Sequence, residues 1–241
     1  MSNNPWSRYA ETLTRLLSLE EPPLAITFSN EAPAGVPTFD DPMPSPTDDG
    51  RTGRVPAGCV FWIKAAERTF VTAPDDHGNC SVGSLTHGLK TIEEVKDNSD
   101  VCAVLEAGWV TPEIIPEIPV VAERHAHITY GPLAETPVDP DVAFLRLNAK
   151  QAMILHNALP EMRFEGKPQC HIVAIAKERG EAAVSVGCML SRVRTGMPAS
   201  QMTCALPARQ LGAIVDRLET TCGADRAVAE YAAEDTQRFE S

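Results

Sequence analysis

The chain has 241 residues, of which 43% are hydrophobic and 22% charged, and its 33 acidic and 21 basic residues give a net charge of −12. This length allows one large domain or two small ones, each with a sizeable core, and the composition is ordinary for a globular protein. The acidity argues against a nucleic-acid partner, because binding to phosphates depends on clustered lysine and arginine. No apolar run reaches the roughly 18 residues that span a bilayer. The N-terminal segment lacks the features of a signal peptide, so we expect a cytoplasmic protein that does not bind membranes.

Hydrophobic periodicity and turn residues predict a chain of mixed helices and strands. Helices are predicted over residues 5–19, 59–68, 81–88, 91–106, 149–159, 208–221 and 225–239, and strands over 24–28, 70–72, 128–130, 142–147, 183–186 and 201–206. Residues 30–58 contain six prolines and four glycines and are predicted to form a long surface loop. Loops of this length are often functional, so this one either covers a site or only connects two elements. Segments 111–119 and 188–198 are expected to be irregular or turn-rich.

Seven cysteines occur along the chain, and because this number is odd, at least one of them lies outside any arrangement of paired cysteines. In a reducing cytoplasm they are not expected to form structural disulfides. They are therefore core residues, metal or cluster ligands, or reactive thiols. The seven are Cys59, Cys80, Cys102, Cys170, Cys188, Cys204 and Cys222.

Two stretches, 59–80 and 170–188, share the same order of features. Each begins with a cysteine and continues through an apolar segment to a Glu-Arg pair, which is Glu67-Arg68 in the first and Glu178-Arg179 in the second. Each then passes through a short β-like run to a second cysteine near a glycine. This order suggests a duplicated element that supplies two cysteines from each copy.

The four cysteines of these stretches, Cys59, Cys80, Cys170 and Cys188, are the leading candidate site. If a pseudo-twofold axis relates the two copies, the four sulfurs would converge on it, and four thiolates suit a [4Fe–4S] cluster or a structural zinc ion. We favour the cluster, with zinc as second choice, because zinc sites usually use closely spaced pairs that hold small units together, and this core is large enough to need none. Against ligation of either kind, the spacings match no compact ligand motif, since the chain has no C-x2-C. Helix starts expected at three of the four also favour thiolates. The alternative is that all four are buried core residues, as free cysteines often are.

Two further side chains, His77 and Arg192, are candidate catalytic residues because they flank these cysteines. His77 is suited to replace a thiolate or to donate a proton, and the planar guanidinium of Arg192 is suited to bind a carboxylate or phosphate. His171, directly after Cys170, has the same possible roles as His77. The alternative for each is a structural contact with a nearby loop or acid. A third hypothesis makes Cys80 a thiol nucleophile with His77 as its base.

Several motifs also resemble those of a known family. They are EPPLAITF (21–28), Gly58-Cys59, NCSVG (79–83), YGPL (130–133), KQAM (150–153) and VGCMLSR (186–192), and they spread over nearly the whole chain. In this order they resemble the domain of unknown function 169 family. The resemblance implies no settled activity. Many relatives belong to anaerobic bacteria and archaea, which suggests oxygen-sensitive cofactors.

Together these features predict an α+β protein, a single compact domain over 1–241 built from two pseudo-repeated α/β halves. The halves cover about 20–125 and 130–222, and a C-terminal helix follows at 225–239. The predicted function is a cytoplasmic iron–sulfur protein, of a redox, desulfurase or dehalogenase type, that acts on a small molecule. A redox reaction would add an electron donor, and the chain is compatible with a homo-oligomer. The alternative is a metal-free ligand-binding or regulatory module with core cysteines. No Walker loop or dinucleotide-binding glycine motif is present, which argues against a nucleotide-driven enzyme.

Overall fold

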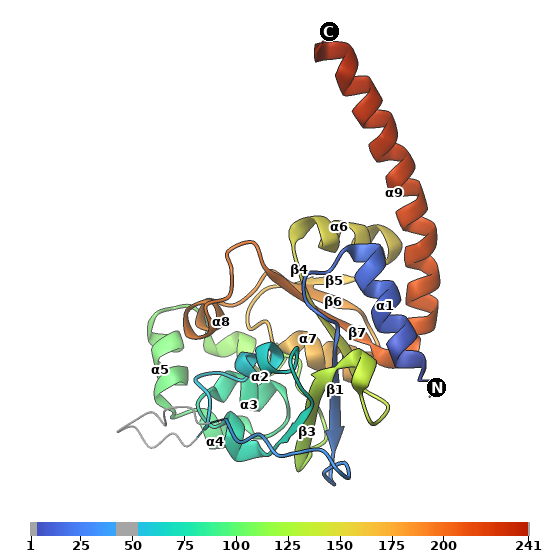
Figure 1. The fold of residues 1–241 in the computed structure, drawn as a ribbon. Helices are drawn as coiled ribbons and strands as arrows, with labels where there is room; N and C mark the ends of the chain where they lie inside the picture. The colour runs from blue at the N-terminus through green and yellow to red at the C-terminus, as the bar shows by residue number, and fades with distance from the viewer. Residues whose placement is uncertain (1–3, 42–52, 241) are drawn as a thin grey trace.

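A single seven-stranded sheet forms the centre of the computed structural model, which describes residues 4–41 and 53–240 (Figure 1). The strand order is β2-β3-β1-β4-β7-β6-β5. All neighbouring strands are antiparallel except β5 and β6, which are parallel. The combination of helices with a mixed sheet confirms the predicted α+β class.

The elements follow one another along the chain as a helix, a strand and then alternating groups of both. The helices are α1 (Pro5–Leu17), α2 (Cys59–Lys64), α3 (Ser81–Thr86), α4 (Ile92–Val95), α5 (Ser99–Glu106), α6 (Ala149–Ala158), α7 (His171–Ala174), α8 (Met189–Thr195) and α9 (Leu211–Glu240). The strands are β1 (Leu24–Ser29), β2 (Phe70–Thr72), β3 (His127–Pro132), β4 (Val142–Leu147), β5 (Arg163–Glu165), β6 (Ala183–Ser185) and β7 (Met202–Pro207). Short 3₁₀ or π turns are η1 (Pro74–His77), η2 (Pro112–Glu117), η3 (Leu133–Glu135), η4 (Ile175–Arg179) and η5 (Ala208–Gln210).

The sheet separates two hydrophobic cores, because successive side chains of a strand point to opposite faces. In β4, Val142 and Phe144 enter one core, whereas Ala143 and Leu145 enter the other. The first core, here called the cysteine face, lies against α2 and α7, and the second, the aliphatic face, lies against α1, α6 and α9. Figure 1 shows α1, α6 and α9 together on one side of the sheet and α2, α3, α4, α5 and α8 grouped on the other.

Local sequence signals explain several of these elements. Asn148 caps α6 in a capping box, in which its side chain accepts from the Gln151 amide (3.1 Å) and Gln151 Oε1 accepts from the Asn148 amide (2.7 Å). Asn4 caps α1 in the same way through the amide of Trp6 (3.1 Å). These predicted helices therefore begin where the sequence placed them.

The strand pairing has the same pattern on both sides of the central β1–β4 pair. Moving outward, β1, β3 and β2 follow on one side, and β4, β7 and β6 follow on the other. A parallel neighbour completes each edge: the isolated bridge from Thr38 to Val71 beside β2, and β5 beside β6. A duplication would produce this order, and the common origin of the two halves stays a prediction.

Two of the predicted helix boundaries were wrong. The helix expected over 91–106 is divided into α4 and α5, because Asn98 has an extended backbone (φ −69°, ψ 145°) and begins a new helix as its N-cap. The helices expected over 208–221 and 225–239 are instead one helix, α9. Gly223 lies inside it, since one glycine in a helix interior costs only about 1 kcal/mol.

Other differences concern segments near the cysteines. The helix expected over 59–68 ends at Lys64, and the connection over 188–198 contains the helix α8. The short edge strand β5 was not predicted. The predicted long loop over 30–58 falls partly outside the described residues, and its described parts contribute the buried side chains Phe39 and Val55 to the cysteine face.

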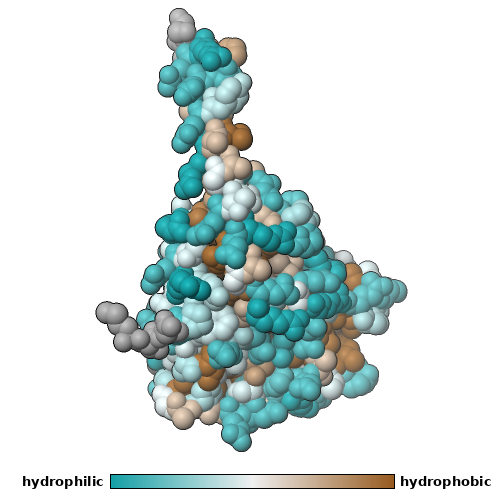
Figure 2. All heavy atoms as spheres, turned by 90° about the vertical axis from the view of Figure 1, so that its right-hand side faces the viewer, coloured by the Kyte–Doolittle hydropathy of each residue, from teal (hydrophilic) through white to brown (hydrophobic). Residues whose placement is uncertain are grey.

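The second half of α9 extends beyond the rest of the chain (Figure 1). Its exposed apolar side chains include Val228, Tyr231 and Phe239, which are 67%, 64% and 84% exposed. Figure 2 shows brown patches along this projecting end of the helix. None of the described helices is both long and apolar enough to cross a membrane.

Candidate functional site

Four short helices begin at the four predicted ligand cysteines. Cys59 is the first residue of α2, and Cys80, Cys170 and Cys188 directly precede α3, α7 and α8. Cys80, Cys170 and Cys188 are buried, and Cys59 is half-buried. The first stretch therefore has the order Cys59-α2-β2-Cys80-α3, and the second has the matching order Cys170-α7-β6-Cys188-α8.

The structure brings these four thiols together. Each of the six pairs among them interacts electrostatically, so that a charge on one thiol disfavours ionisation of the others. Burial raises the pKa of Cys59 to about 12, and the neighbouring Cys80 raises it further. Burial likewise raises the pKa of Cys80 and raises that of Cys170 well above its usual range. Without a bound cation, these three thiols are therefore neutral at physiological pH.

Three side chains place hydrogen-bond donors beside the sulfurs. Gln169 Nε2 donates to Cys59 Sγ at 3.3 Å, and Thr86 Oγ1 lies 3.1 Å from Cys170 Sγ. The hydroxyl of Ser191 in α8 also lowers the pKa of Cys59, in opposition to burial. Such donors stabilise an anionic sulfur more than a neutral one. These donors therefore oppose the effect of burial on the pKa of the thiols.

His77 lies beside this site with one ring nitrogen engaged. Thr72 Oγ1 lies 3.0 Å from the Ile128 carbonyl oxygen and 3.0 Å from His77 Nε2. Because the carbonyl can only accept, Thr72 donates to it and accepts from Nε2–H, which leaves Nδ1 unprotonated. Burial lowers the pKa of His77 well below its usual range, and the nearby His87 lowers it further. His77 Nδ1 is buried without a hydrogen-bond partner, and a Cβ on Gly58 would lie only 3.3 Å from it.

His87 is a second buried neutral histidine, one that sequence reasoning missed. Its Nδ1 lies 2.8 Å from the Gly83 carbonyl oxygen, so Nδ1 carries the proton and Nε2 is a free acceptor. Burial lowers the pKa of His87 to about 4, although the hydrogen bond to Gly83 opposes this. Its Nε2 is buried without a partner. The two imidazole rings lie 6.2 Å apart between centroids.

The two arginines of α8 have different surroundings. The predicted site residue Arg192 donates to the carbonyl oxygens of Val186 (2.7 Å), Pro198 (2.6 Å) and Gln201 (3.1 Å). These bonds hold the loops on either side of α8. Arg194 was not predicted, yet it is the arginine whose charge lowers the pKa of Cys80, in opposition to burial. Arg194 Nη1 also donates to the Asn79 carbonyl oxygen at 3.4 Å.

His171 is buried beside a carboxylate, with its Nε2 at 3.3 Å from Glu165 Oε2. Burial lowers the pKa of His171, and Glu165 opposes that effect. Glu165 also accepts from Arg163 Nε at 2.7 Å. Because burial holds the ring neutral, this contact with Glu165 at the edge of the sheet is a structural one and not an ion pair.

Asn79, which precedes Cys80, holds the described end of the long loop against the site. Its side-chain nitrogen donates to the carbonyl oxygens of Gly53 (2.5 Å) and Val55 (2.9 Å), and its side-chain oxygen accepts from the Gly53 amide (3.1 Å). A Cβ on Gly53 would lie 2.5 Å from the Asn79 backbone nitrogen, so only glycine fits. The end of the loop is therefore built onto the cysteine site.

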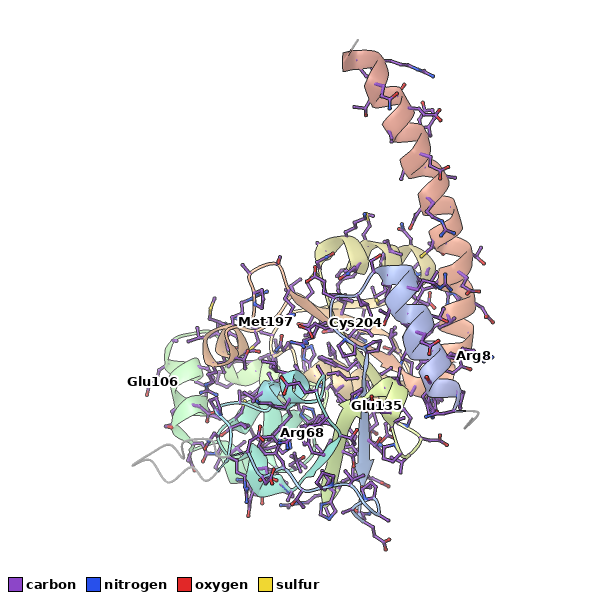
Figure 3. All side chains as sticks on the ribbon, in the orientation of Figure 1. Arg8, Arg68, Glu106, Glu135, Met197 and Cys204 are labelled. Atoms are coloured by element: carbon purple, nitrogen blue, oxygen red, sulfur yellow. The ribbon has the colours of Figure 1, made fainter. Side chains whose placement is uncertain are left out.

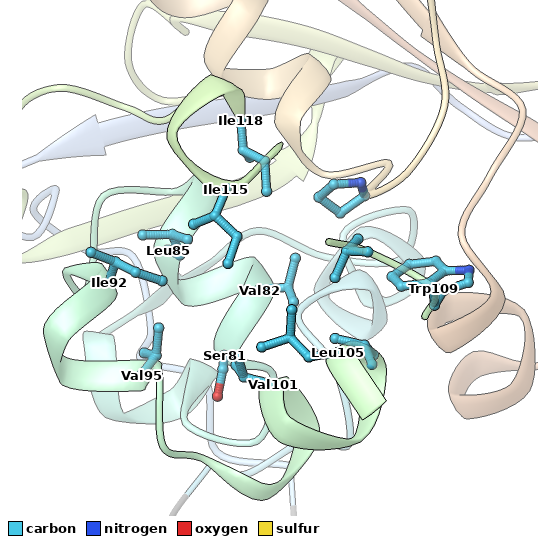
Figure 4. A pocket seen from close by; sticks show the side chains of 13 residues that line it. Ser81, Val82, Leu85, Ile92, Val95, Val101, Leu105, Trp109, Ile115 and Ile118 are labelled. Carbon is cyan, nitrogen blue, oxygen red and sulfur yellow. The ribbon is translucent and has the colours of Figure 1, made fainter. Parts of the chain in front are cut away.

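An apolar cavity of about 40 Å³ adjoins the site (Figure 4). Ser81, Val82 and Leu85 of α3 line it together with Val101 and Trp109. Pro168, two residues before Cys170, also lines it. Its volume exceeds the share of one water molecule, about 30 Å³, but is far below the roughly 300 Å³ of a typical ligand pocket.

Within residues 4–41 and 53–240, no group of three or more His, Cys, Asp or Glu side chains is arranged to hold a single metal ion. A tetrahedral ion with metal–sulfur bonds of about 2.3 Å needs sulfurs about 3.8 Å apart. The four thiols are therefore neighbours, but they do not form a compact single-ion centre.

Comparison with protein families decides the membership of the chain. The model of the family described as DUF169, uncharacterised ArCR, matches residues 12–217. The chain belongs to this family. Comparison with the curated proteins and with the solved structures found no match to this chain.

The four cysteines and His77 were named from the sequence, and their role as site residues stays a prediction; the residues that surround them were not named. The position of α3 brings Thr86 and the adjoining His87 to the site, and the turn before α7 brings Gln169 there. Gln169 could have been suspected, since it directly precedes Cys170. Tyr130 lies in the YGPL motif, but only the pairing of β3 with β1 and β2 places it beside the cysteines.

Proposed function

We propose that this protein binds a [4Fe–4S] cluster through Cys59, Cys80, Cys170 and Cys188. The observation that carries the proposal is the convergence of four thiols, from two stretches about 110 residues apart, on one face of the sheet. Cysteines that only fill a core have no reason to gather in one place. Cys204, by contrast, lies on the aliphatic face, and nothing but burial raises its pKa.

The donor set and its spacing favour a cluster over zinc. Four thiolates can hold either group. Zinc would require the compact tetrahedron that the described residues do not form. A four-iron cluster is larger than one ion, so its cysteine ligands stand further apart. Neighbouring thiols without the compact arrangement of a single-ion centre therefore fit the cluster better.

Binding would be coupled to proton release, because buried thiols must ionise to become ligands. The raised pKa values of Cys59, Cys80 and Cys170 mean that these protons are held in the metal-free protein. Thr86 and Gln169 then supply hydrogen bonds to the resulting thiolates. Cluster binding should therefore strengthen as the pH rises toward the thiol pKa values.

We infer a redox, desulfurase or dehalogenase type of reaction on a small molecule in the cytoplasm, with an external electron donor if the reaction is redox. His77 presents an unprotonated Nδ1 without a partner, but burial lowers its pKa, so it is suited to offer a neutral nitrogen as a ligand or hydrogen-bond acceptor and not to take up a proton. Arg192 is better assigned to holding the loops around α8, since its guanidinium already makes three hydrogen bonds. Arg194 replaces it as the cation near the sulfurs.

Anaerobic purification followed by iron and sulfide assays tests the proposal. We expect about four irons and four sulfides per chain, together with the broad visible absorption of a cluster. Single Cys→Ala substitutions at Cys80 and Cys170 should remove most of the iron, whereas Cys204→Ala, which also changes a buried cysteine, should keep it. Colourless protein without iron, or equal iron in all three variants, would contradict the proposal.

The second candidate is a metal-free module that binds a small apolar ligand or regulates a partner. The thiols, which are neutral when no cation is bound, favour it. In this case each Cys→Ala change would lower stability in proportion to lost packing and abolish no specific property. The iron assay on the same variants separates the two candidates.

A further inference from the structure

The half of α9 that follows Asp225 projects from the rest of the protein (Figure 1 and Figure 3). The first half packs against α1 and α6, and Asn157 of α6 still donates to Asp225 at 3.5 Å. Beyond this contact, residues 226–239 are exposed, apart from the half-buried Asp235. Helices in proteins draw most of their stability from packing an amphipathic face. A projecting helix of this length therefore needs a partner that covers one of its faces.

The projecting half of α9 has such an apolar face. Val228, Ala232 and Phe239 follow one another at spacings of four and seven residues, which places them on the same side of the helix, and Tyr231 borders them. Val228, Tyr231 and Phe239 are strongly exposed large hydrophobic side chains. Glu230 falls on the opposite side of the helix. One side of this half is therefore suited to a partner and the other to water.

A cavity of about 580 Å³ lies at the root of the projecting half, between α1, α6 and α9. Its lining includes the apolar side chains of Leu16 and Ala229 and one cation from each helix, Arg15, Lys150 and Arg226. Since Ala229 directly follows Val228, the cavity adjoins the apolar face. Cavities of this size enclose whole small molecules, so this one has room for the end of a helix.

The charges of this root cavity complement those of the tip of α9. The root has three cations against the two acids Glu20 and Asp225, and it includes the N-terminal end of α6, where the helix dipole is positive. The tip, residues 230–240, has four acids and one base, and it is the C-terminal end of α9, where the helix dipole is negative. A tip should therefore be attracted to a root, although the whole chain carries a net charge of −12.

We propose that the projecting half of α9 pairs antiparallel with the same segment of a second copy of this chain, so that the tip of each helix occupies the root cavity of the other. Tip and root are present on one chain, and a twofold axis brings both pairs of surfaces together at once. From Arg226 to Phe239 the helix rises about 20 Å, so two helices that lie side by side bring each Phe239 level with the other root. The projecting half lies outside residues 12–217, which match the family, so this contact is an addition to the family domain.

Sedimentation equilibrium of the full-length protein over a range of concentrations tests the pairing. We expect the unmodified protein to be a dimer. Val228→Glu should raise the dissociation constant about tenfold or more, because it places an unpaired charge in the middle of the apolar face. Val193→Glu is the matched control, since Val193 is 77% exposed on α8, on the other side of the sheet, and it should leave the dimer intact.

Lys150→Glu distinguishes an antiparallel pair from a parallel one. Only the antiparallel pair brings the acidic tip of one copy to the root of the other, so Lys150→Glu should weaken the dimer. Lys96→Glu makes the same change of charge at an exposed lysine that follows α4, and it should have no effect. Added salt should also weaken the unmodified dimer, because it screens the attraction between tip and root.

Unmodified protein that is monomeric at every concentration, or equal effects of Val228→Glu and Val193→Glu, would overturn the pairing. A dimer on which Lys150→Glu and Lys96→Glu have equal effects would overturn the antiparallel arrangement. The inference does not rest on the proposed function, which is judged by iron content in the same preparations. A failure of the pairing is therefore distinguishable from a failure of the proposed cluster.

Discussion

The two faces of the sheet bury their polar groups in different ways. Each face has a buried glutamine, Gln151 on the aliphatic face and Gln169 on the cysteine face. Gln151 uses both ends of its amide: Nε2 donates to the carbonyl oxygens of Leu17 (3.1 Å) and Ser18 (2.9 Å), and Oε1 accepts from the Asn148 amide. Gln169 donates to Cys59 Sγ, and its Oε1 has no partner.

The same contrast extends to the side chains around each glutamine. The aliphatic face consists largely of Leu, Ile, Val and Ala from α1, α6, α9 and the sheet. The cysteine face is rich in aromatic residues and borders the unpartnered atoms His77 Nδ1, His87 Nε2 and Tyr130 Oη. An arrangement selected only for stability would satisfy or remove such groups. The opposite face also has unpartnered hydroxyls, those of Thr27 and Thr129, so the two faces differ in the kind of group: only the cysteine face combines unpartnered imidazole and phenol atoms with the four thiols.

The largest effects should come from truncating one large side chain on each face. Leu155→Ala in α6 and Phe61→Ala in α2 each remove a fully buried side chain, at an expected cost of about 2–5 kcal/mol in the free energy of unfolding. Only Phe61→Ala should also lower the iron bound per folded molecule, because Phe61 lies in the helix that begins at Cys59. Denaturation curves and iron assays on the folded fraction check both expectations. Equal iron loss in the two variants would remove the functional distinction between the faces.

The histidines of the cysteine face predict a pH dependence of the metal-free protein. The pKa of His87 falls from 6.5 to about 4 on folding because of burial. Above pH 6.5 the histidine is neutral in both the folded and the unfolded state, so its titration takes nothing from the free energy of unfolding. As the pH falls toward 4, the unfolded chain takes up a proton that the folded chain does not, and about 3 kcal/mol is lost. His77 acts in the same direction, because burial lowers its pKa as well.

Urea denaturation at a series of pH values between 7.5 and 4.5 measures this loss, and His87→Gln should reduce it. His156→Gln, in α6, is the control for the substitution itself. A stability that does not change over this range would show that neither histidine is held neutral by burial.

The two glutamines provide a smaller and more direct comparison. Gln151→Leu leaves two carbonyl groups and one amide without their partner, so we expect a loss of about 1–3 kcal/mol in the free energy of unfolding. Gln169→Leu in the metal-free protein removes one contact to a neutral thiol and one unpartnered oxygen, so the loss should be smaller. Urea denaturation of both variants checks the order. A larger loss for Gln169→Leu would mean that the buried polar groups of the cysteine face are hydrogen-bonded at least as fully as those of the aliphatic face.

Patterns along the chain predicted much of the fold and the centre of the site. The alternation in Val142–Leu147 and the capping residue Asn148 located β4 and α6 correctly. The shared order of features in 59–80 and 170–188 predicted that four cysteines would meet, and the structure brings them together. Local signals were sufficient there because each cysteine begins a short helix next to a recognisable strand.

The rest of the site depends on topology that no local pattern encodes. Tyr130 lies near Cys59 and Cys170 only because β3 is inserted between β2 and β1, a long-range pairing. The sequence singled out Arg192 because it follows Cys188 closely. Arg194 also follows Cys188, and only the directions of the two side chains distinguish their roles. The continuity of α9 through Gly223 likewise depends on packing of its first half against α1 and α6.

The smallest expected effect is the most demanding test of the contrast between the faces. In the metal-free protein the Tyr130 hydroxyl is buried without a partner, so Tyr130→Phe removes a cost and no bond. We therefore expect a change in the free energy of unfolding between zero and about 1 kcal/mol of stabilisation. Tyr9→Phe in α1, on the aliphatic side, is a control for the substitution itself. A clear destabilisation by Tyr130→Phe would mean that the phenol already has a hydrogen-bond partner in the metal-free state. The Tyr130 hydroxyl would then no longer count among the unpartnered groups of the cysteine face.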